Sequence, residues 1–140
     1  MLKIERFRNF PIESNCYVIY TAESNKCLII DPGSEDSFEI IRFLNATDLY
    51  PEYIFLTHEH FDHIWGVRHL KQIFNVNVLC SKECSTAIIN PKKNMSIFYD
   101  QIGFELNKAD QIITQRYEQQ YFNNLSLHFL HTPGHTIGSM

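Results

Sequence analysis

The chain has 140 residues, of which 44% are apolar and 20% charged, and this composition predicts one globular domain spanning 1–140 rather than a disordered chain. The formal net charge of −4 excludes a broadly basic surface for sequence-independent binding of nucleic acid. No apolar stretch could span a membrane and the start does not resemble a signal peptide, so we expect a cytoplasmic protein without membrane contact and with four reduced, mostly buried cysteines.

Short strands and helices alternate in the first half of the chain. Residues 16–21 (CYVIYT) and 27–30 (CLII) predict a hairpin, which ends at the turn Asp31-Pro32-Gly33. Residues 53–56 (YIFL) predict a strand buried on both faces, because their apolar run does not alternate with polar residues. Between these strands, Ser37 is expected to cap a helix whose apolar face contains Phe38, Ile41, Phe43 and Leu44.

The second half continues the same alternation. A strand is expected at 76–80, a short helix at 82–89, and a packed loop over 92–114. Residues 117–122 and 125–130 flank Asn123-Asn124, a dipeptide typical of a tight hairpin turn. This interleaving predicts an α/β or mixed α+β fold. An amphipathic helix over 65–74 is expected to present Val67, Leu70, Ile73 and Phe74 on one face.

A segment rich in histidine follows directly on the expected strand 53–56. Side chains two positions apart in an extended chain point the same way, so His58 and His60 can reach one point, with Asp62 on the same side. His63 has the opposite parity and reaches that point only if the chain turns there. Imidazole nitrogens and a carboxylate are the usual ligands of zinc and its first-row neighbours. The segment therefore predicts a metal site.

A second pair of histidines lies near the end of the chain. His131 and His135 are four residues apart, but Pro133 and Gly134 between them prevent a helix that would place both on one face. One histidine at the tip of a kinked loop can therefore face a metal while the other cannot easily do so. Local geometry does not choose between them.

These segments resemble motifs of the metallo-β-lactamase superfamily. Residues 57–63 (THEHFDH) resemble its Thr-His-x-His-x-Asp-His signature. Residues 131–139 (HTPGHTIGS) resemble its next motif, in the form typical of the glyoxalase II-like (hydroxyacylglutathione hydrolase-like) branch, and Asp31-Pro32-Gly33 resembles its early turn. The resemblance implies the N-terminal half of an αββα sandwich.

The resemblance also implies roles for individual residues. His58, His60 and His135 would bind a first metal ion, and Asp62 and His63 a second. Asp31 would stabilise the site from outside, with His131 as a neighbour of the ligands. Asp62 is the residue for which a catalytic role is expected, orienting the attacking water or accepting its proton.

In the family pattern two further ligands, a bridging aspartate and a final histidine, lie downstream of the second motif. The 140 residues contain neither of them. We therefore expect an apparently truncated domain that binds one zinc ion, where a complete relative would bind two. Iron and manganese are possible alternatives to zinc. An uncovered inner sheet face and one uncovered edge would expose an apolar patch, for which we expect self-association or a partner that covers the face.

The implied function is hydrolysis of a small thioester or related acyl substrate by metal-bound hydroxide, with the metal lowering the pKa of its water. Two alternatives stay open. One is an iron-dependent persulfide dioxygenase-like enzyme, and the other is a catalytically impaired fragment that binds metal without turnover.

Overall fold

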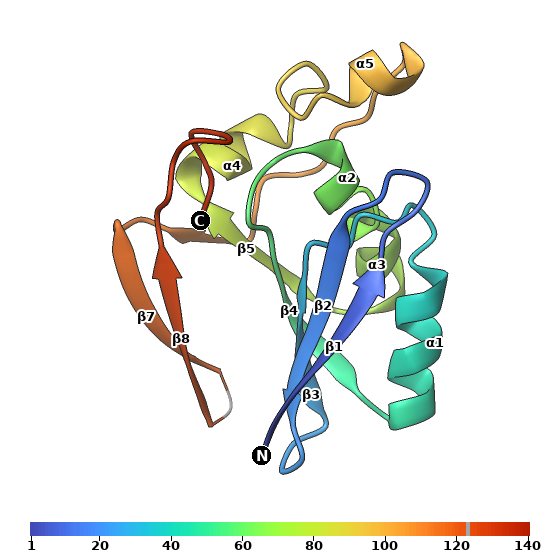
Figure 1. The fold of residues 1–140 in the computed structure, drawn as a ribbon, viewed down its shortest axis with the longest axis vertical. Coiled ribbons are helices and arrows are strands. Elements are labelled where there is room, and N and C mark those ends of the chain that lie inside the picture. Colours follow the sequence, from blue (N-terminus) through green and yellow to red (C-terminus); the bar gives the residue numbers. More distant parts are fainter. Residues whose placement is uncertain (123) are drawn as a thin grey trace.

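The computed structural model describes residues 1–122 and 124–140, and its main feature is a mixed β-sheet (Figure 1). In these residues the second strand of the sheet runs antiparallel to the first and the third, and the third to sixth strands run parallel. In spatial order the six strands are β1 (Leu2–Arg8), β2 (Asn15–Thr21), β3 (Lys26–Ile30), β4 (Tyr50–Phe55), β5 (Asn77–Ser81) and β6 (Gln111–Ile113).

Helices in the connections cover one face of this sheet. Ile40 and Leu44 on the first helix and Leu70 on the third are buried against Ile54 of β4, in a single apolar core. The helices are α1 (Phe38–Thr47), α2 (Phe61–Ile64), α3 (Val67–Ile73), α4 (Lys82–Ala87) and α5 (Ser96–Asp100). None of them is long and apolar enough to cross a membrane, in the part of the chain that the structure describes.

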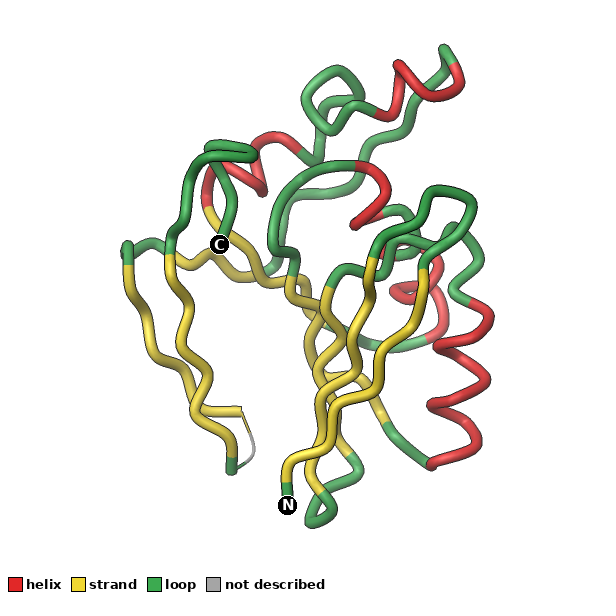
Figure 2. Tube along the Cα trace, in the orientation of Figure 1, coloured by secondary structure: helices red, strands yellow, loops and turns green. Residues whose placement is uncertain are grey.

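A two-stranded hairpin, β7 (Tyr117–Phe122) and β8 (Leu125–Leu130), lies on the opposite face of the sheet (Figure 2). The ring of Phe129 on β8 lies 4.9 Å from that of Phe55, and Phe122 on β7 lies 5.9 Å from Tyr53. The molecule therefore has one helical layer, a sheet, and two strands of a second sheet layer. The predicted mixed α/β class is confirmed.

The strand at the centre of the sheet is buried on both faces, as its unbroken apolar run predicts. Ile54 points into the core beneath the helices, whereas Phe55 points into the core beneath the hairpin. The side chains of neighbouring β5 alternate in the same way: Cys80 lies in the core beneath the helices and Leu79 in the core beneath the hairpin. Successive side chains on a strand face opposite sides, so a strand between two layers needs apolar residues at every position.

Within residues 1–122 and 124–140, the inner face of the six-stranded sheet is uncovered at the β1 edge. The hairpin covers β3 to β5, but Leu2 and Ile4 on β1 are 51% and 55% exposed. Ile4 pairs with Ile19 of β2, which packs on the hairpin core, so these exposed side chains lie on the hairpin side of the sheet. Strand β1 itself was not predicted, because its charged residues conceal the short alternation of Leu2 and Ile4.

The start of α1 differs from the prediction. Ser37 has a left-handed backbone conformation (φ 49°), and its hydroxyl donates to the carbonyls of Ser34 and Gly66 instead of capping the helix. The carboxylate of Asp36 accepts the hydrogen bond from the Phe38 amide. The predicted apolar face is also wrong in part, because Phe38 is exposed while Ile40 is buried.

Three smaller differences occur later in the chain. Ile73 was predicted to lie on the apolar face of a helix over 65–74, but it is exposed. The helix α3 starts only at Val67, and its buried residues are Val67 and Leu70. The expected loop 92–114 contains both α5 and β6. The hairpin predicted around Asn123-Asn124 forms, although Asn123 lies outside the described residues. All four cysteines are free and buried, as expected.

Candidate metal centre

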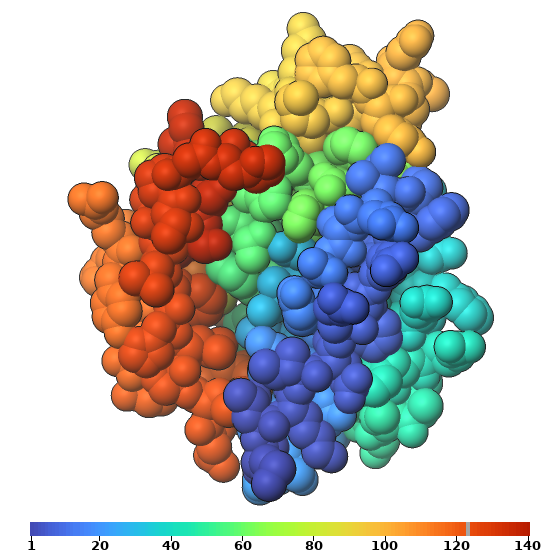
Figure 3. Space-filling view, viewed as in Figure 1, coloured from blue at the N-terminus to red at the C-terminus, as the bar shows by residue number. Residues whose placement is uncertain are grey.

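Two loops that are distant in sequence meet beside the end of β4. The chain leaves β4 at Phe55 and passes through residues 57–60 before α2 begins at Phe61. The loop that follows β8 returns to the same place, where the amide of Met140 donates to the carbonyl of Thr57 at 3.0 Å. In Figure 3 the C-terminal segment, in red, lies against the green segment that follows β4.

Three histidines converge at this meeting point. Ligand nitrogens of His58, His60 and His135 all lie within 4.8 Å of one another. Their ring centroids are 4.9 Å apart for His58 and His60, 4.8 Å for His58 and His135, and 4.7 Å for His60 and His135. His58 is buried, His60 is half-buried and His135 is exposed, so the cluster opens to solvent on the side of His135.

One ring nitrogen of His58 is buried without a hydrogen-bond partner in the part of the chain that the structure describes. This nitrogen is Nε2, while Nδ1 of the same ring lies 3.0 Å from the hydroxyl of Thr57. A buried polar atom without a partner is destabilising by roughly 1–3 kcal/mol. Burial and the neighbouring His63, His60 and His135 lower the pKa of His58 to about 3, so the ring is neutral. A neutral imidazole with a free, buried Nε2 fits a metal ligand.

The same physical causes act on His60. Burial and the adjacent imidazole of His135 lower its pKa, outweighing the opposite effect of Glu59 and Asp62. Imidazole groups that are held neutral and close together can share a cation without first losing protons. The donor set therefore fits a zinc-type ion with three nitrogen ligands and one open position.

Asp31 supports the cluster from the turn after β3. Its two carboxylate oxygens accept hydrogen bonds from the Thr57 amide (2.8 Å), the Thr57 hydroxyl (2.6 Å) and Nδ1 of His63 (3.0 Å). A ligand oxygen of Asp31 also lies within 4.8 Å of nitrogens of His58 and His63. Because both oxygens are already engaged by hydrogen bonds, we interpret Asp31 as a support for the ligands and not as a ligand.

The turn into α2 determines the position of His63. The helix starts at Phe61, so the chain does turn where the parity of His63 requires it. With Nδ1 directed at Asp31, Nε2 of His63 faces the Asp62 carboxylate at 3.5 Å. Burial by itself would lower the pKa of His63, but the hydrogen bond that its ring donates to Asp31 and the charges of Asp31 and Asp62 raise it overall. Asp62 is in neither of the two ligand groups, within the described chain.

The structure distinguishes the two histidines of the last loop. Nε2 of His131 lies 2.8 Å from the carbonyl oxygen of Ile137, to which it donates a hydrogen bond across the loop. His135, by contrast, points at His58 and His60. His131 thus closes the loop that presents His135. Among the described residues, His69 and His128 belong to neither ligand group.

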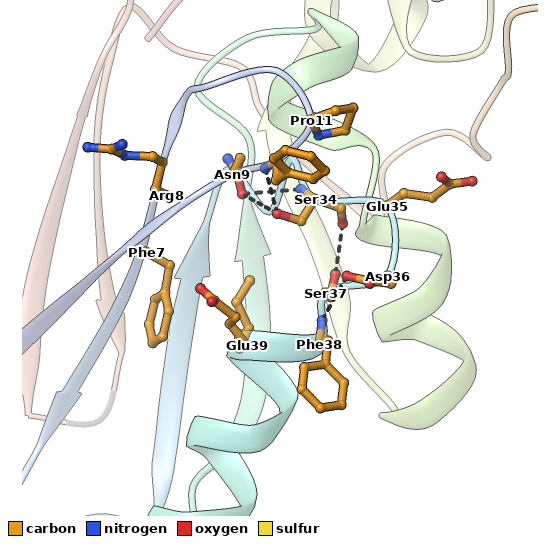
Figure 4. Close-up of a pocket in the computed structure, with 12 residues that line it drawn as sticks. Phe7, Arg8, Asn9, Pro11, Ser34, Glu35, Asp36, Ser37, Phe38 and Glu39 are labelled. Carbon is orange, nitrogen blue, oxygen red and sulfur yellow. Dashed lines mark hydrogen bonds between the residues drawn. The ribbon is translucent and has the colours of Figure 1, made fainter.

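A buried asparagine, which the sequence analysis did not single out, holds the supporting loops together. It lies at the wall of a cavity of about 620 Å³ between β1 and the start of α1 (Figure 4). The Nδ2 of Asn9 donates to the Ser14 hydroxyl (2.7 Å) and to the Asp31 carbonyl (3.0 Å), and its Oδ1 accepts from the Ser34 amide (3.1 Å). Ser14 in turn donates to the Asp62 carbonyl at 2.6 Å.

Gly33 permits the close approach of these loops. A Cβ atom at this position would lie 1.6 Å from the Asp62 carbonyl oxygen and 2.7 Å from Nδ2 of Asn9. Any larger residue would therefore push the turn after β3 away from α2. The sequence offered Asp31-Pro32-Gly33 only as a turn, and the contact with Asp62 could not be read from it.

With this fold and this histidine cluster, the chain belongs to the metallo-beta-lactamase superfamily, whose family model matches residues 10–140. It is 35% identical over 120 residues to hydroxyacylglutathione hydrolase 1 of Vibrio vulnificus (strain YJ016), covering 86% of this chain and 40% of that protein. It is 29% identical to hydroxyacylglutathione hydrolase GloC of Haemophilus influenzae (strain ATCC 51907 / DSM 11121 / KW20 / Rd), covering 98% and 64%.

Two further relatives also match nearly all of this chain over part of their own length. The probable metallo-hydrolase YqgX of Bacillus subtilis (strain 168) is 30% identical, with 99% of this chain and 64% of that protein covered. The crystal structure of the B3 metallo-beta-lactamase BLEG-1 superposes with a TM-score of 0.88 at 28% identity, covering 98% of this chain and 65% of that one. The chain thus spans between 40% and 65% of the length of these four relatives.

Proposed function

We propose that the chain forms the metal-binding part of a zinc-dependent hydrolase that cleaves a small thioester or related acyl substrate. The observation that carries the proposal is the convergence of His58, His60 and His135 around the unpartnered, buried Nε2 of His58. These three residues would hold the ion. The Asp62 carboxylate and His63 lie beside them and would contribute to a second, weaker position.

An ion held by His58, His60 and His135 would supply a water nucleophile that is activated at neutral pH and a Lewis acid for the substrate carbonyl. Asp62 would accept a proton from the attacking water, since its carboxylate is partly exposed and close to the cluster. In thioester hydrolysis the water oxygen bonds to the carbonyl carbon, the carbon–sulfur bond breaks, and the thiolate takes up a proton. The exposed side of His135 leaves the cluster open to such a substrate.

The substrate class is supported by the relatives. Two of them are named hydroxyacylglutathione hydrolases, and such a substrate is a thioester. The fold and the histidine cluster alone are compatible with several acyl substrates. We therefore propose the thioester as the first class to test.

The test begins with metal content. The 140-residue chain should bind one zinc ion, measured by elemental analysis after dialysis and by titration against a chromophoric chelator. His60→Ala should weaken binding by more than the roughly 10- to 100-fold that loss of an outer-shell partner typically costs. His128→Ala is the matched control, because His128 lies on the exposed face of the hairpin, outside the cluster.

Turnover is then measured on a panel of acylglutathione and other thioesters, lactones and β-lactams. We expect thioester hydrolysis by the zinc form that is lost in His60→Ala and kept in His128→Ala. Equal rates in the unaltered chain and His60→Ala would reject the hydrolase. Zinc binding without any turnover would favour the metal-binding fragment, and iron in protein prepared without added metal would favour the dioxygenase.

A further inference from the structure

One side-chain hydrogen bond joins the two loops of the candidate metal centre. The hydroxyl of Thr136 donates to Oε2 of Glu59 at 3.0 Å, although the two residues are 77 positions apart. Glu59 stands between His58 and His60, and Thr136 follows His135 directly. This Glu59–Thr136 bridge therefore connects the immediate neighbours of all three candidate ligands.

Glu59 is largely buried at the wall of a cavity that His135 and Thr136 also line. Its side chain has the opposite parity to the two histidines that flank it, and only 9% of the residue is exposed. A Cβ atom added at Gly138 would lie 3.0 Å from Oε2 of Glu59 and 2.7 Å from the amide of Cys84. The last loop is thus pressed against Glu59, with the Gly138 carbonyl held by the Ser81 hydroxyl at 2.8 Å.

The Thr136 end of the bridge is fixed as well. The Thr136 amide donates to the Ser139 hydroxyl at 3.1 Å, and the two hydroxyls lie 3.0 Å apart. The histidine that Thr136 follows has less support, because His135 is exposed and a Cβ atom at the adjacent Gly134 would meet no atom within 4 Å. Thr136, whose carbonyl also accepts from the Gly134 amide at 3.1 Å, is therefore an attachment point directly beside His135.

We infer that Glu59 is a positioning residue for the proposed metal site, which holds His135 within ligand distance of His58 and His60 through Thr136. The inference rests on the proposed function, since it concerns the same ion. A buried carboxylate is strongly destabilising unless it accepts hydrogen bonds, so Glu59 has a physical reason to keep Thr136 in place. A solvent-exposed glutamate would be hydrated by water and would not need the Thr136 hydroxyl.

The test compares zinc affinities of the 140-residue chain and its variants, measured by competition with a chromophoric chelator. Glu59→Ala and Thr136→Val each remove the bridge and should weaken zinc binding by about 10- to 100-fold, the usual effect of losing an outer-shell partner. Glu59→Gln and Thr136→Ser keep an acceptor and a hydroxyl and should bind within a few-fold of the unaltered chain. Glu83→Ala, an exposed glutamate lining the same cavity as Glu59, is the matched control and should not change the affinity.

A positioning role is separated from a merely structural one by repeating the comparison in a His135→Ala background. If Glu59 acts through His135, Glu59→Ala should have no further effect on the residual affinity once His135 is removed. An unchanged affinity in both Glu59→Ala and Thr136→Val, or an equal loss with and without His135, would overturn the inference. If the unaltered chain binds no zinc, the proposed function itself is rejected. Thr136→Val carries the test should Glu59→Ala fail to fold.

Discussion

Asp31 accepts two hydrogen bonds from Thr57, one from the backbone amide at 2.8 Å and one from the hydroxyl at 2.6 Å. The same hydroxyl lies 3.0 Å from Nδ1 of His58, and Asp31 also accepts from Nδ1 of His63. A single carboxylate on the turn after β3 thereby fixes the orientation of two rings on the neighbouring loop. In both rings Nδ1 is engaged, so a metal would be bound through Nε2, which has no hydrogen-bond partner among the described residues in His58 and faces the Asp62 carboxylate at 3.5 Å in His63.

We predict that Asp31→Asn lowers zinc affinity by about 10- to 100-fold, because the amide nitrogen that replaces one oxygen cannot accept from Thr57 and His63. The unfolding free energy should also fall by about 1–3 kcal/mol, as a buried donor is left without its acceptor. Zinc titration and urea unfolding of the metal-free chain measure the two effects. Glu35→Gln, an exposed change in the same turn, should alter neither. Unchanged zinc affinity in Asp31→Asn would contradict the supporting role.

The two histidines of the last loop should respond differently to removal. His135→Ala is expected to abolish high-affinity zinc binding, because it deletes one of three ligands. His131→Ala should retain zinc binding and reduce the unfolding free energy by about 1 kcal/mol, since it loses the hydrogen bond to the Ile137 carbonyl. Chelator competition on both variants decides the point. A greater loss of zinc in His131→Ala than in His135→Ala would show that the assignment is reversed.

The hairpin should be attached to the sheet mainly by its inward aromatic rings. Phe129 is buried and its ring lies 4.9 Å from that of Phe55, so Phe129→Ala should lower the unfolding free energy by about 3–5 kcal/mol. Zinc affinity should fall with it, because β8 leads directly into the loop that carries His135. Tyr121→Ala on the outer face, where Tyr121 is 79% exposed, should change stability by less than about 0.5 kcal/mol. Similar urea midpoints for the two variants would refute this account of the hairpin.

The stability of the chain should depend on pH through Asp110, which joins β5 to the start of β6. Burial raises the pKa of Asp110, but hydrogen bonds from Lys71 (2.6 Å) and the Val78 amide (2.7 Å) lower it overall from 3.8. The depressed pKa means that the stabilisation is present above pH 3.8 and is lost as the pH falls through the folded value. Asp110→Asn should therefore cost about 1 kcal/mol at pH 7, a figure reduced for the partial exposure of the pair, and progressively less below about pH 4.

Urea unfolding of the unaltered chain and Asp110→Asn at pH 7, 5, 4 and 3 measures this difference. Glu5→Gln, an exposed change on β1, provides the control for loss of one negative charge. A difference that stays constant over this range, or that grows as the pH falls, would refute the assignment.

Much of the local structure followed from short-range patterns. The apolar run around Ile54 predicted a strand between two layers, and the parity of His58 and His60 predicted that they share a direction, because side chains alternate along an extended chain. Pro133 and Gly134 excluded a helix in the last loop. The family resemblance of the two histidine motifs is confirmed, whereas the roles of the individual ligands stay predictions.

The sequence by itself determined the class of fold, the family and the set of histidines from which a metal site could be built, since these depend on alternation and turn chemistry within a few residues. The family resemblance implied His135 rather than His131 as a ligand, but local geometry did not. Only the tertiary structure brings His135 to His58, bonds His131 to the Ile137 carbonyl and engages both oxygens of Asp31. It alone brought Thr136 to Glu59. These relationships depend on hydrogen bonds and close contacts between loops that are up to 77 residues apart, and no local pattern specifies which side chain meets which across such a distance.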